Sequence, residues 1–542
     1  MNSLDWILVF IFMAGMIAMA TYLGRKQRTK KDYYLGGYKV NHWAIAISTM
    51  ATQCSTNSLL GAPAFVIAVG GLLWLQYELA VPLAMIGVMR FLLPFFRRQQ
   101  VVSVYEYLEK RFGPGSRTLL SVLFQFLRAF STGVTVYGIS IVIQQLIGMP
   151  FWMAVLILGL ITVFYDFLGG MQAVIYSDVI QMIILYIGIT VCLGYAVHFA
   201  GGWGNVWATF PAEKLRTLDF SGWGFHQGKT FTFWPMLIGG FFLYLSYYGC
   251  DQTQVQRELS AGDLDKTNMS LFINGVVRFP LVITYCLVGV AIGAFMIQHP
   301  EFLQHITNPA TGEPNYNLVV PAFCLHYLPH GIIGLVIVAL FAAAMSSLDS
   351  TINSLSATTV HDIIERFFVR GGLQGRAGMI WARLTTIFWG GVCVTFSFFV
   401  GDISKSIIES INKISSVANG PILGTFLLAT LTRRTNDRGV MIGIIAGFLG
   451  NIYLWNYCPG ISWLWWNVIG CAITCSMGYV ASLAFPSPPA SKINEELIFR
   501  ANAMEQFGYR RHWARYQWGL VFYFLFMLLI LKGIDMLGRL GS

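Results

Sequence analysis

Long apolar segments alternate with short polar ones along most of the chain, and this pattern predicts a polytopic helical membrane protein. About fourteen segments are long and apolar enough to cross a bilayer as helices. They lie near residues 5–24, 41–71, 74–96, 118–147, 150–170, 174–201, 234–256, 271–297, 331–364, 377–401, 405–432, 439–457, 462–485 and 515–535. Long outer loops are expected at 202–233 and 298–330, and no stretch predicts a soluble domain.

One apolar segment turns polar at its centre, where residues 52–58 read Thr-Gln-Cys-Ser-Thr-Asn-Ser. Within hydrocarbon every backbone N–H and C=O must find a partner, so irregular polar backbone persists only where it lines a cavity or binds something. The run therefore predicts a helix that breaks at a binding site in mid-membrane.

The basic residues predict the orientation of the spans. Alternate loops on one side carry 24 Lys and Arg residues, against 6 on the other side. Because cytoplasmic loops are enriched in Lys and Arg, the richer side is expected to be the inner one. Both termini are then expected outside, and an even number of spans agrees with this because it places both termini on the same side.

Composition agrees with this class and excludes others. The chain is 56% hydrophobic and only 11% charged, too apolar for a soluble globular protein. Its nearest approach to a phosphate loop, from Gly222 to Thr230, has the wrong glycine spacing and lies in an outer loop. No enzyme activity, nucleotide or nucleic-acid partner is expected, and transport driven by an ion gradient is favoured over a pump.

A later apolar segment carries a cluster of oxygen-bearing side chains. Ala343, Ser346, Ser347, Asp349 and Ser350 fall on one face of a helix. Na⁺ is a hard cation that needs several oxygen ligands, and carbonyls freed at the break, such as those of Ala51 and Cys54, could complete the shell. The alternative is that the serines serve only close helix packing, which the intramembrane Asp349 makes weaker.

Other charges fall inside predicted spans. Arg128 lies about ten residues into its span and therefore needs an anionic partner, either Glu78 or a substrate carboxylate. Asp178 is either a cation ligand or an interfacial carboxylate, and Arg278 is expected to reach water near a span end. Tyr247 and Tyr248 could gate a cavity or serve packing.

Four motifs give the chain a resemblance to the sodium:solute symporter family. They are residues 343–354, residues 169–181, Gln254-Val255-Gln256-Arg257, and Ser103-Val104-Tyr105-Glu106-Tyr107-Leu108. The resemblance covers roughly residues 40–435 and implies an all-α LeuT-type fold of two inverted five-helix repeats. The units would be 1–40 (first helix and basic inner loop), 41–201 (first repeat), 202–233 (outer loop), 234–432 (second repeat) and 433–542 (three further helices). Each repeat would open with a broken helix.

The resemblance also implies binding residues. A first sodium site would use the carbonyls of Ala51, Cys54 and Ala343 with the hydroxyls of Ser346 and Ser347. A second, found in the sialic acid branch of the family, would use Asp178, Ser346, Asp349 and Ser350. Asp349 stands where that branch has serine, so it could bind Na⁺ or carry a proton. The same branch matches the substrate positions Thr52, Ser55, Thr56, Gln76 and Arg128.

The implied function is sodium-coupled import of a small organic anion by alternating access, with sialic acid, monocarboxylates and vitamin-like acids as candidates. The alternatives are a sodium/sugar or sodium/polyol symporter, an H⁺-coupled carrier, or a solute sensor that does not transport. Na⁺ is the expected ion, and the expected location is the cell membrane, the inner membrane if the source is bacterial.

Overall fold

The structure is a computed structural model that describes residues 2–54, 56–308, 312–369, 372–399, 407–494, 496–499 and 511–540. The side chains at 56–57, 407–411, 511–512 and 539–540 are outside this description. Two predicted substrate residues are affected, because Ser55 and the side chain of Thr56 lie outside the described part of the chain.

Helices make up nearly all of the regular structure. The longer ones are α1 (Ser3–Gly24), α3 (His42–Gln53), α4 (Thr56–Ala68), α6 (Ala80–Phe91), α9 (Pro114–Ile147), α10 (Phe151–Phe199), α12 (Gly240–Cys250), α14 (Leu264–Gln298), α17 (Ile332–Thr358), α18 (Gly375–Ser397), α19 (Ile407–Leu431), α20 (Asp437–Tyr457), α21 (Trp463–Leu483) and α23 (Arg511–Leu540). Shorter pieces are α2 (Lys30–Leu35), η1 (Gly36–Tyr38), η2 (Gly71–Leu73), α5 (Trp74–Glu78), α7 (Leu93–Gln99), α8 (Val104–Arg111), α11 (Trp203–Thr209), η3 (Ala212–Leu215), η4 (Pro235–Gly239), α13 (Gln252–Leu259), η5 (Pro300–Phe302), α15 (Leu303–Ile306), η6 (Tyr316–Leu318), α16 (Val319–Tyr327), η7 (Thr359–Phe368) and η8 (Ala490–Lys492). Among the described residues the only β-pairing is an isolated bridge between Thr307 and Pro314.

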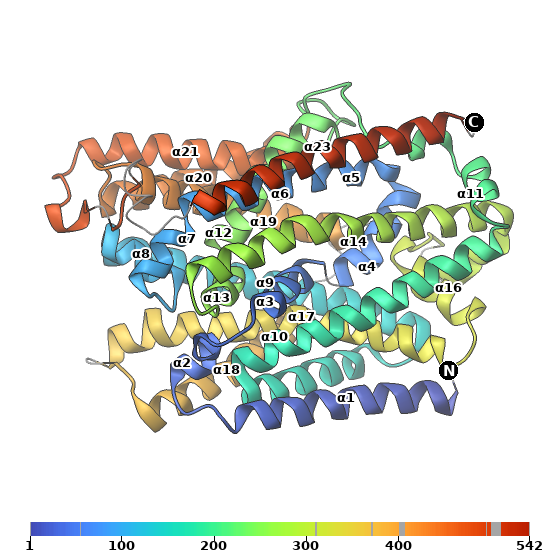
Figure 1. The fold of residues 1–542 in the computed structure, drawn as a ribbon, viewed down its shortest axis with the longest axis horizontal. Coiled ribbons are helices and arrows are strands. Elements are labelled where there is room, and N and C mark those ends of the chain that lie inside the picture. The colour runs from blue at the N-terminus through green and yellow to red at the C-terminus, as the bar shows by residue number, and fades with distance from the viewer. Residues whose placement is uncertain are drawn as a thin grey trace.

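The long helices run roughly side by side, and both chain ends lie at the same end of the bundle (Figure 1). Helices α3, α9, α12, α14 and α19 lie in the middle of the view, between α1 and α18 on one side and α20, α21 and α23 on the other. This arrangement places the polar segments of α3 and α17 deep inside the bundle, where Thr52 and Ser350 are both buried.

Eleven described helical segments are long and apolar enough to cross a membrane by length and composition. This number does not reproduce the predicted fourteen, because α10 counts once and the two interrupted segments at 42–68 and 235–259 are not counted. The count of fourteen and the outer position of the termini remain predictions.

Helix α10 contains the boundary predicted between residues 170 and 174. Gly170 has φ 52° and ψ −156°, a non-helical conformation that divides α10 into 151–169 and 171–199. A side chain is strained at this φ, and a Cβ would also lie 2.6 Å from the carbonyl oxygen of Tyr33. Glycine is therefore required for this turn.

Two helices are broken near the centre of the bundle. The first break separates α3 from α4, with Cys54 outside helical geometry at φ −86° and ψ 54°. The second separates α12 from α13 at Asp251, whose backbone is extended at φ −84° and ψ 125°. The polar run at 52–58 predicted the first break, and the family resemblance implied a broken helix at the start of the second repeat.

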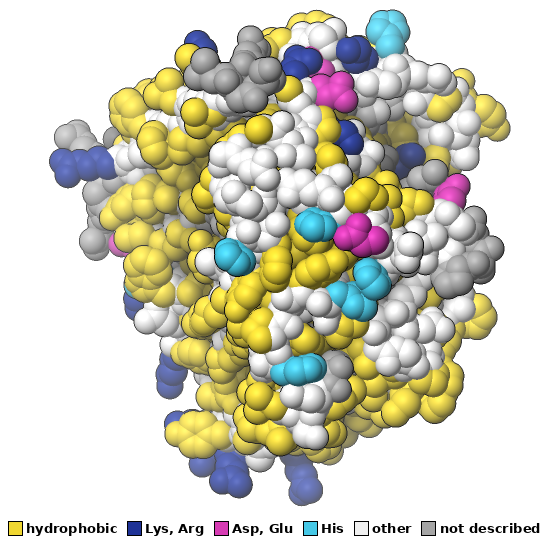
Figure 2. All heavy atoms as spheres, turned by 90° about the vertical axis from the view of Figure 1, so that its right-hand side faces the viewer, with side chains coloured by type: hydrophobic (Ala, Val, Ile, Leu, Met, Phe, Trp, Pro, Cys, Tyr) yellow, Lys and Arg dark blue, Asp and Glu magenta, His cyan; other side chains and the backbone are white. Residues whose placement is uncertain are grey.

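The outer surface suits a lipid environment. Large apolar side chains on α1, α10, α20 and α23 are exposed, among them Phe10, Leu160, Leu449 and Phe522. Figure 2 faces the end of the molecule where both termini lie and shows several histidine side chains gathered there among apolar and uncharged groups. Broad apolar exposure along the helices is expected where lipid tails replace water.

Candidate functional site

The break after α3 lies directly against the serine segment of α17. The hydroxyl groups of Thr52 and Ser350 lie 3.3 Å apart, and the Thr52 hydroxyl donates to the carbonyl of Ser48 at 3.0 Å. Residues almost 300 positions apart in the sequence therefore meet at one point. The two polar segments that the sequence singled out are neighbours in the fold.

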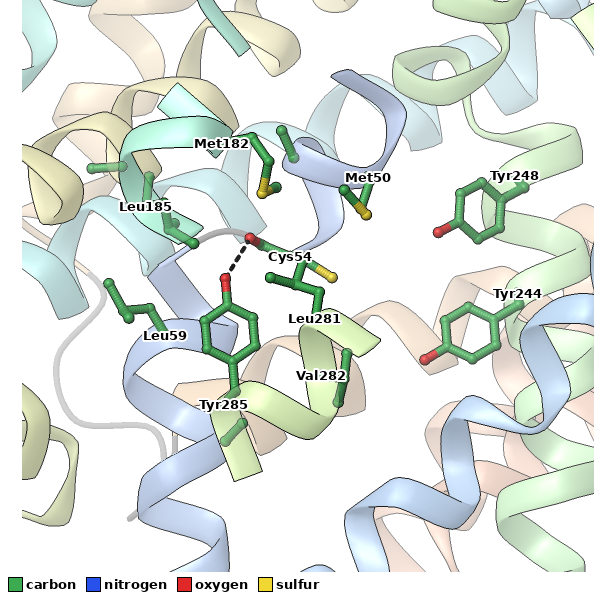
Figure 3. Packing of buried hydrophobic residues seen from close by; sticks show 14 of the residues in the cluster. Met50, Cys54, Leu59, Met182, Leu185, Tyr244, Tyr248, Leu281, Val282 and Tyr285 are labelled. Carbon is green, nitrogen blue, oxygen red and sulfur yellow. Dashed lines mark hydrogen bonds between the residues drawn. The ribbon is translucent and has the colours of Figure 1, made fainter. Parts of the chain in front are cut away.

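Carbonyl and hydroxyl oxygens lie on the same two segments as this contact. Because α3 ends at Gln53, the carbonyls of its last turn have no helical partners further along α3. The Cys54 carbonyl accepts a hydrogen bond from the Tyr285 hydroxyl at 3.5 Å, among buried apolar side chains (Figure 3). On α17 the Ser346 hydroxyl donates to the Ala343 carbonyl at 3.0 Å, whereas the buried Ser347 hydroxyl has no partner. Carbonyl and hydroxyl oxygens of this kind are the ligands that hard cations prefer.

The residues predicted for a second cation form a fully buried network. Asp178 accepts a hydrogen bond from the Ser48 hydroxyl at 2.5 Å and lies 3.4 Å from Arg257. Asp349 is bonded to the Tyr165 hydroxyl and accepts from the Ser177 hydroxyl at 3.3 Å.

Ser350 completes this network. Its hydroxyl donates to the Ser346 carbonyl at 2.5 Å and is also bonded to Arg257. The second oxygen of Asp178, Oδ1, is buried without a partner. The predicted ligands of the second site are therefore brought together, with one acceptor unused.

Arg257 is the member of this network that the sequence analysis misplaced. It was counted among the basic residues of the inner loops, but its side chain is fully buried on α13. It donates to the hydroxyl of Ser48 at 2.8 Å and pairs with Asp178. Its place in the motif Gln254-Val255-Gln256-Arg257 was the available signal, because a charge in a family motif often marks a site.

A cavity that encloses about 930 Å³ of unfilled space, part of it open solvent, lies beside the break after α3 and reaches Tyr247 near the end of α12. Its walls come from α3 to α5, α9, α12, α14, α17 and α19. They are rich in hydroxyl and amide groups: Thr52, Gln53, Ser58, Ser131, Thr132, Thr135, Ser347, Thr351, Asn412, Ser415 and Asn419. Two arginines, Arg128 and Arg278, also line it. Such a chamber suits a small polar solute.

Arg128 projects from α9 into the wall of this cavity. One terminal nitrogen donates to the hydroxyls of Tyr247 at 3.3 Å and Thr253 at 3.0 Å, and the other lies 3.7 Å from Asp251. Its Nε is buried and has no partner. The interpretation that Arg128 pairs with Glu78 is therefore wrong.

Glu78 instead belongs to Arg278. The carboxylate lies 2.5 Å from Arg278 Nε, and the pair is almost completely buried, with side-chain exposures of 2% and 5%. The hydroxyls of Tyr244 and Tyr248 accept from the same guanidinium at 3.1 and 3.0 Å. The expectation that Arg278 reaches water is also wrong, because sequence position alone could not show the carboxylate that α5 places beside it.

The other predicted residues fall in different places. Tyr247 lines the cavity with its ring under Arg128, 5.3 Å from ring centroid to guanidinium carbon. Tyr248 is fully buried and its hydroxyl is bonded to the Gln53 side chain. Gln76 is not among the cavity residues, since its amide donates to the Phe231 carbonyl at 2.8 Å and accepts from the backbone of Asp219 at 3.2 Å.

Comparisons with known proteins are consistent with this geometry. The model of the sodium:solute symporter family matches residues 33–447. The sodium/sialic acid symporter NanT of Aliivibrio fischeri is 27% identical over 499 residues, which are 92% of this chain and 96% of the relative. The human sodium-coupled monocarboxylate transporter 1 is 28% identical over 458 residues, 82% of this chain and 72% of the relative. A solved substrate-bound, outward-open structure of a Na⁺-coupled sialic acid symporter has a TM-score of 0.79 and 25% identity, covering 90% of this chain and 99% of that one.

Proposed function

Because the chain belongs to the sodium:solute symporter family, we propose that this sodium-coupled membrane protein imports a small organic solute that carries a carboxylate. One observation carries the choice of a carboxylate: Arg128 lines the cavity with its Nε buried and unpartnered. By contrast, all three nitrogens of Arg278 are hydrogen-bonded to protein groups. Arginine presents a planar fork that matches a carboxylate in two hydrogen bonds.

The residues have distinct roles in this proposal. Arg128 binds the carboxylate, and Thr52 offers its hydroxyl to the rest of the solute, together with Ser55 and Thr56 by resemblance. Gln76, held by Phe231 and Asp219, orders the outer wall instead of touching the solute. Tyr247 closes the cavity beside Arg128, and Tyr248 supports the break in α3 through Gln53.

A thermal-shift screen of the purified protein tests the proposal. Carboxylates such as sialic acid and lactate are compared with neutral sugars, each in Na⁺ and in K⁺. We expect stabilisation by at least one carboxylate in Na⁺ and none in K⁺. Stabilisation by neutral sugars alone would favour the sugar or polyol alternative.

We propose that the chain contains two repeats, 41–201 and 234–432, joined by the loop 202–233. The segments 1–40 and 433–542 flank the repeats. Each repeat opens with one of the two broken helices, at Cys54 and at Asp251. Both termini are placed outside, which is compatible with their position at one end of the bundle (Figure 1).

Removing one sodium ligand should weaken sodium dependence before it affects folding. We expect Ser347→Ala to raise the sodium concentration for half-maximal uptake by about 10- to 100-fold, the range for losing one polar contact to a charged group. Ser354→Ala is the matched control, because Ser354 lies on the same helix and its hydroxyl donates to the Thr351 carbonyl. Uptake that is equal in Na⁺ and K⁺ in the unaltered protein would contradict sodium coupling itself.

A second cation is proposed from the charges of the buried network. When both are ionised, Asp178 and Asp349 carry two negative charges against the single positive charge of Arg257, and all three side chains are fully buried. An uncompensated charge in the interior is costly, so a bound cation would restore neutrality. We propose that Asp178, Ser346, Asp349 and Ser350 hold this second Na⁺.

Two Na⁺ moving with a monoanion would make uptake electrogenic, gaining about 2.3 kcal/mol per 100 mV of membrane potential. We expect a substrate-evoked current and a sodium Hill coefficient above one. Asp349→Asn should reduce the Hill coefficient toward one. It is easier to interpret than Asp178→Asn, which also breaks the ion pair with Arg257. A coefficient of one without current in the unaltered protein would leave only the first site.

A further inference from the structure

Arg128 stands between two cavities that follow one another along α9. The first cavity, described above, reaches Thr132 and Thr135. A second, with about 430 Å³ of unfilled space, part of it open solvent, reaches Phe124 and Leu127, which lie within about one turn of Arg128 toward the start of the helix. Five of the described residues line both cavities, namely Arg128, Ser131, Tyr247, Ser415 and Asn419, and Arg128 and Tyr247 therefore form part of the partition between them.

Asp251 lies on the far side of this partition. It lines the second cavity and is not among the residues of the first. Its position is defined by the break between α12 and α13, where it caps α13: one carboxylate oxygen accepts from the backbone N–H of Thr253 at 2.8 Å and from its hydroxyl at 2.5 Å. The other oxygen faces Arg128.

The contact between the two side chains is an ion pair without a direct hydrogen bond. The distance from Arg128 Nη1 to Asp251 Oδ2 is 3.7 Å, beyond normal hydrogen-bond length. Thr253 bridges the pair, accepting from Arg128 at 3.0 Å while donating to Asp251. Both charged side chains are partly exposed, at 16% and 14%. The charge of Arg128 is thus balanced, while its fork retains an unused Nε.

We infer that Asp251 is an internal carboxylate that competes with the carboxylate of the transported solute for Arg128, and so sets how tightly an anion binds and how fast it leaves. This inference rests on the proposed function. A solute carboxylate arriving from the first cavity can form hydrogen bonds with the guanidinium of Arg128, whereas Asp251 forms no direct hydrogen bond with it. A neutral solute has no negative charge to replace that of Asp251 beside Arg128. Displacing Asp251 therefore gives a neutral solute no gain in binding free energy.

The same arrangement gives Asp251 a part in release. Once a bound anion neutralises Arg128, the negative charge of Asp251 lies close by on the side of the second cavity and repels the anion. When Asp251 again forms its ion pair with Arg128, the anion loses its positively charged partner. Like-charge contacts of this kind weaken binding and speed dissociation.

Asp251→Asn tests the inference, because asparagine caps a helix as well as aspartate but carries no charge. Titration calorimetry in Na⁺ would measure binding of two anions, lactate and sialic acid, and of two uncharged counterparts, lactamide and sialic acid methyl ester. We expect the Kd of at least one anion to fall about 2- to 5-fold, the scale of a charge pair that water partly screens, with no tightening for the uncharged compounds. Turnover in uptake should fall, because release slows.

Asp263→Asn is the matched control. Asp263 also caps a helix, accepting from the backbone of Lys266 at 2.8 Å, but its side chain is 53% exposed and away from both cavities. Its replacement should leave every Kd unchanged. Asp251→Ser serves as a second uncharged cap if the asparagine variant is recovered in low yield.

The outcomes separate the inference from the proposed function. If the unaltered protein binds lactate or sialic acid and both Asp251 variants bind it with the same Kd, the competition is overturned while the function stands. Equal tightening for anions and uncharged compounds also overturns it. If neither the unaltered protein nor the variants bind either anion, the assignment of a carboxylate solute fails, and the inference fails with it.

Discussion

Arg278→Gln is expected to destabilise the protein by about 3–5 kcal/mol, since removing one member of a buried ion pair leaves the other charge without compensation. The stranded group would be Glu78, whose side chain is 2% exposed. The hydroxyls of Tyr244 and Tyr248 would lose their shared donor as well. The melting temperature of purified protein in detergent measures the effect.

A double variant distinguishes a lost ion pair from general damage. Arg278→Gln combined with Glu78→Gln removes both charges and should recover a large part of the stability. Arg98→Gln is the control, because its pair with Glu496 is exposed at 38% and 51% and should contribute at most about 1 kcal/mol. Equal destabilisation by Arg98→Gln and Arg278→Gln would contradict the argument from burial.

Arg128→Gln should have its large effect on binding instead of stability. Losing a hydrogen-bonded charge partner costs about 2–5 kcal/mol, so carboxylate affinity should fall at least about 30-fold. Expression and melting temperature should change little. Asp251, which loses its partner, is partly exposed and still caps α13. Binding is measured by calorimetry with lactate and sialic acid in Na⁺.

Arg128→Lys provides the matched comparison. It keeps the positive charge but loses the planar fork, so it should restore only part of the affinity. Full restoration by lysine would show that charge alone is needed. Unchanged carboxylate affinity in Arg128→Gln would remove Arg128 from the binding site.

Much of the fold could be read from local features of the sequence. Long apolar segments predict membrane helices because backbone groups in lipid must be satisfied within the helix itself. The polar run at 52–58 predicted the break at Cys54 for the same reason, and the structure has that break. The spacing of Ser346, Ser347 and Ser350 placed these hydroxyls on one helix.

Pairings between distant charges could not be read in this way. Arg128 and Glu78 were candidate partners because they were intramembrane charges of opposite sign. In the structure Arg128 pairs with Asp251, and Glu78 pairs with Arg278. Arg257 was assigned to an inner loop because the predicted span 234–256 ends just before it, but it lies on α13 and is fully buried. Each of these outcomes depends on how helices far apart in the sequence pack.

By itself, the sequence determined the class of protein, the broken first helix and the oxygen-rich face of α17, because these follow from hydropathy and helical periodicity within single segments. The tertiary structure decided which carboxylate neutralises which arginine, and with it which arginine keeps a free edge for a solute. The physical reason is that electrostatic energy in a low-dielectric interior depends on distances of a few ångströms between groups on different helices. Such distances exist only once the helices have packed.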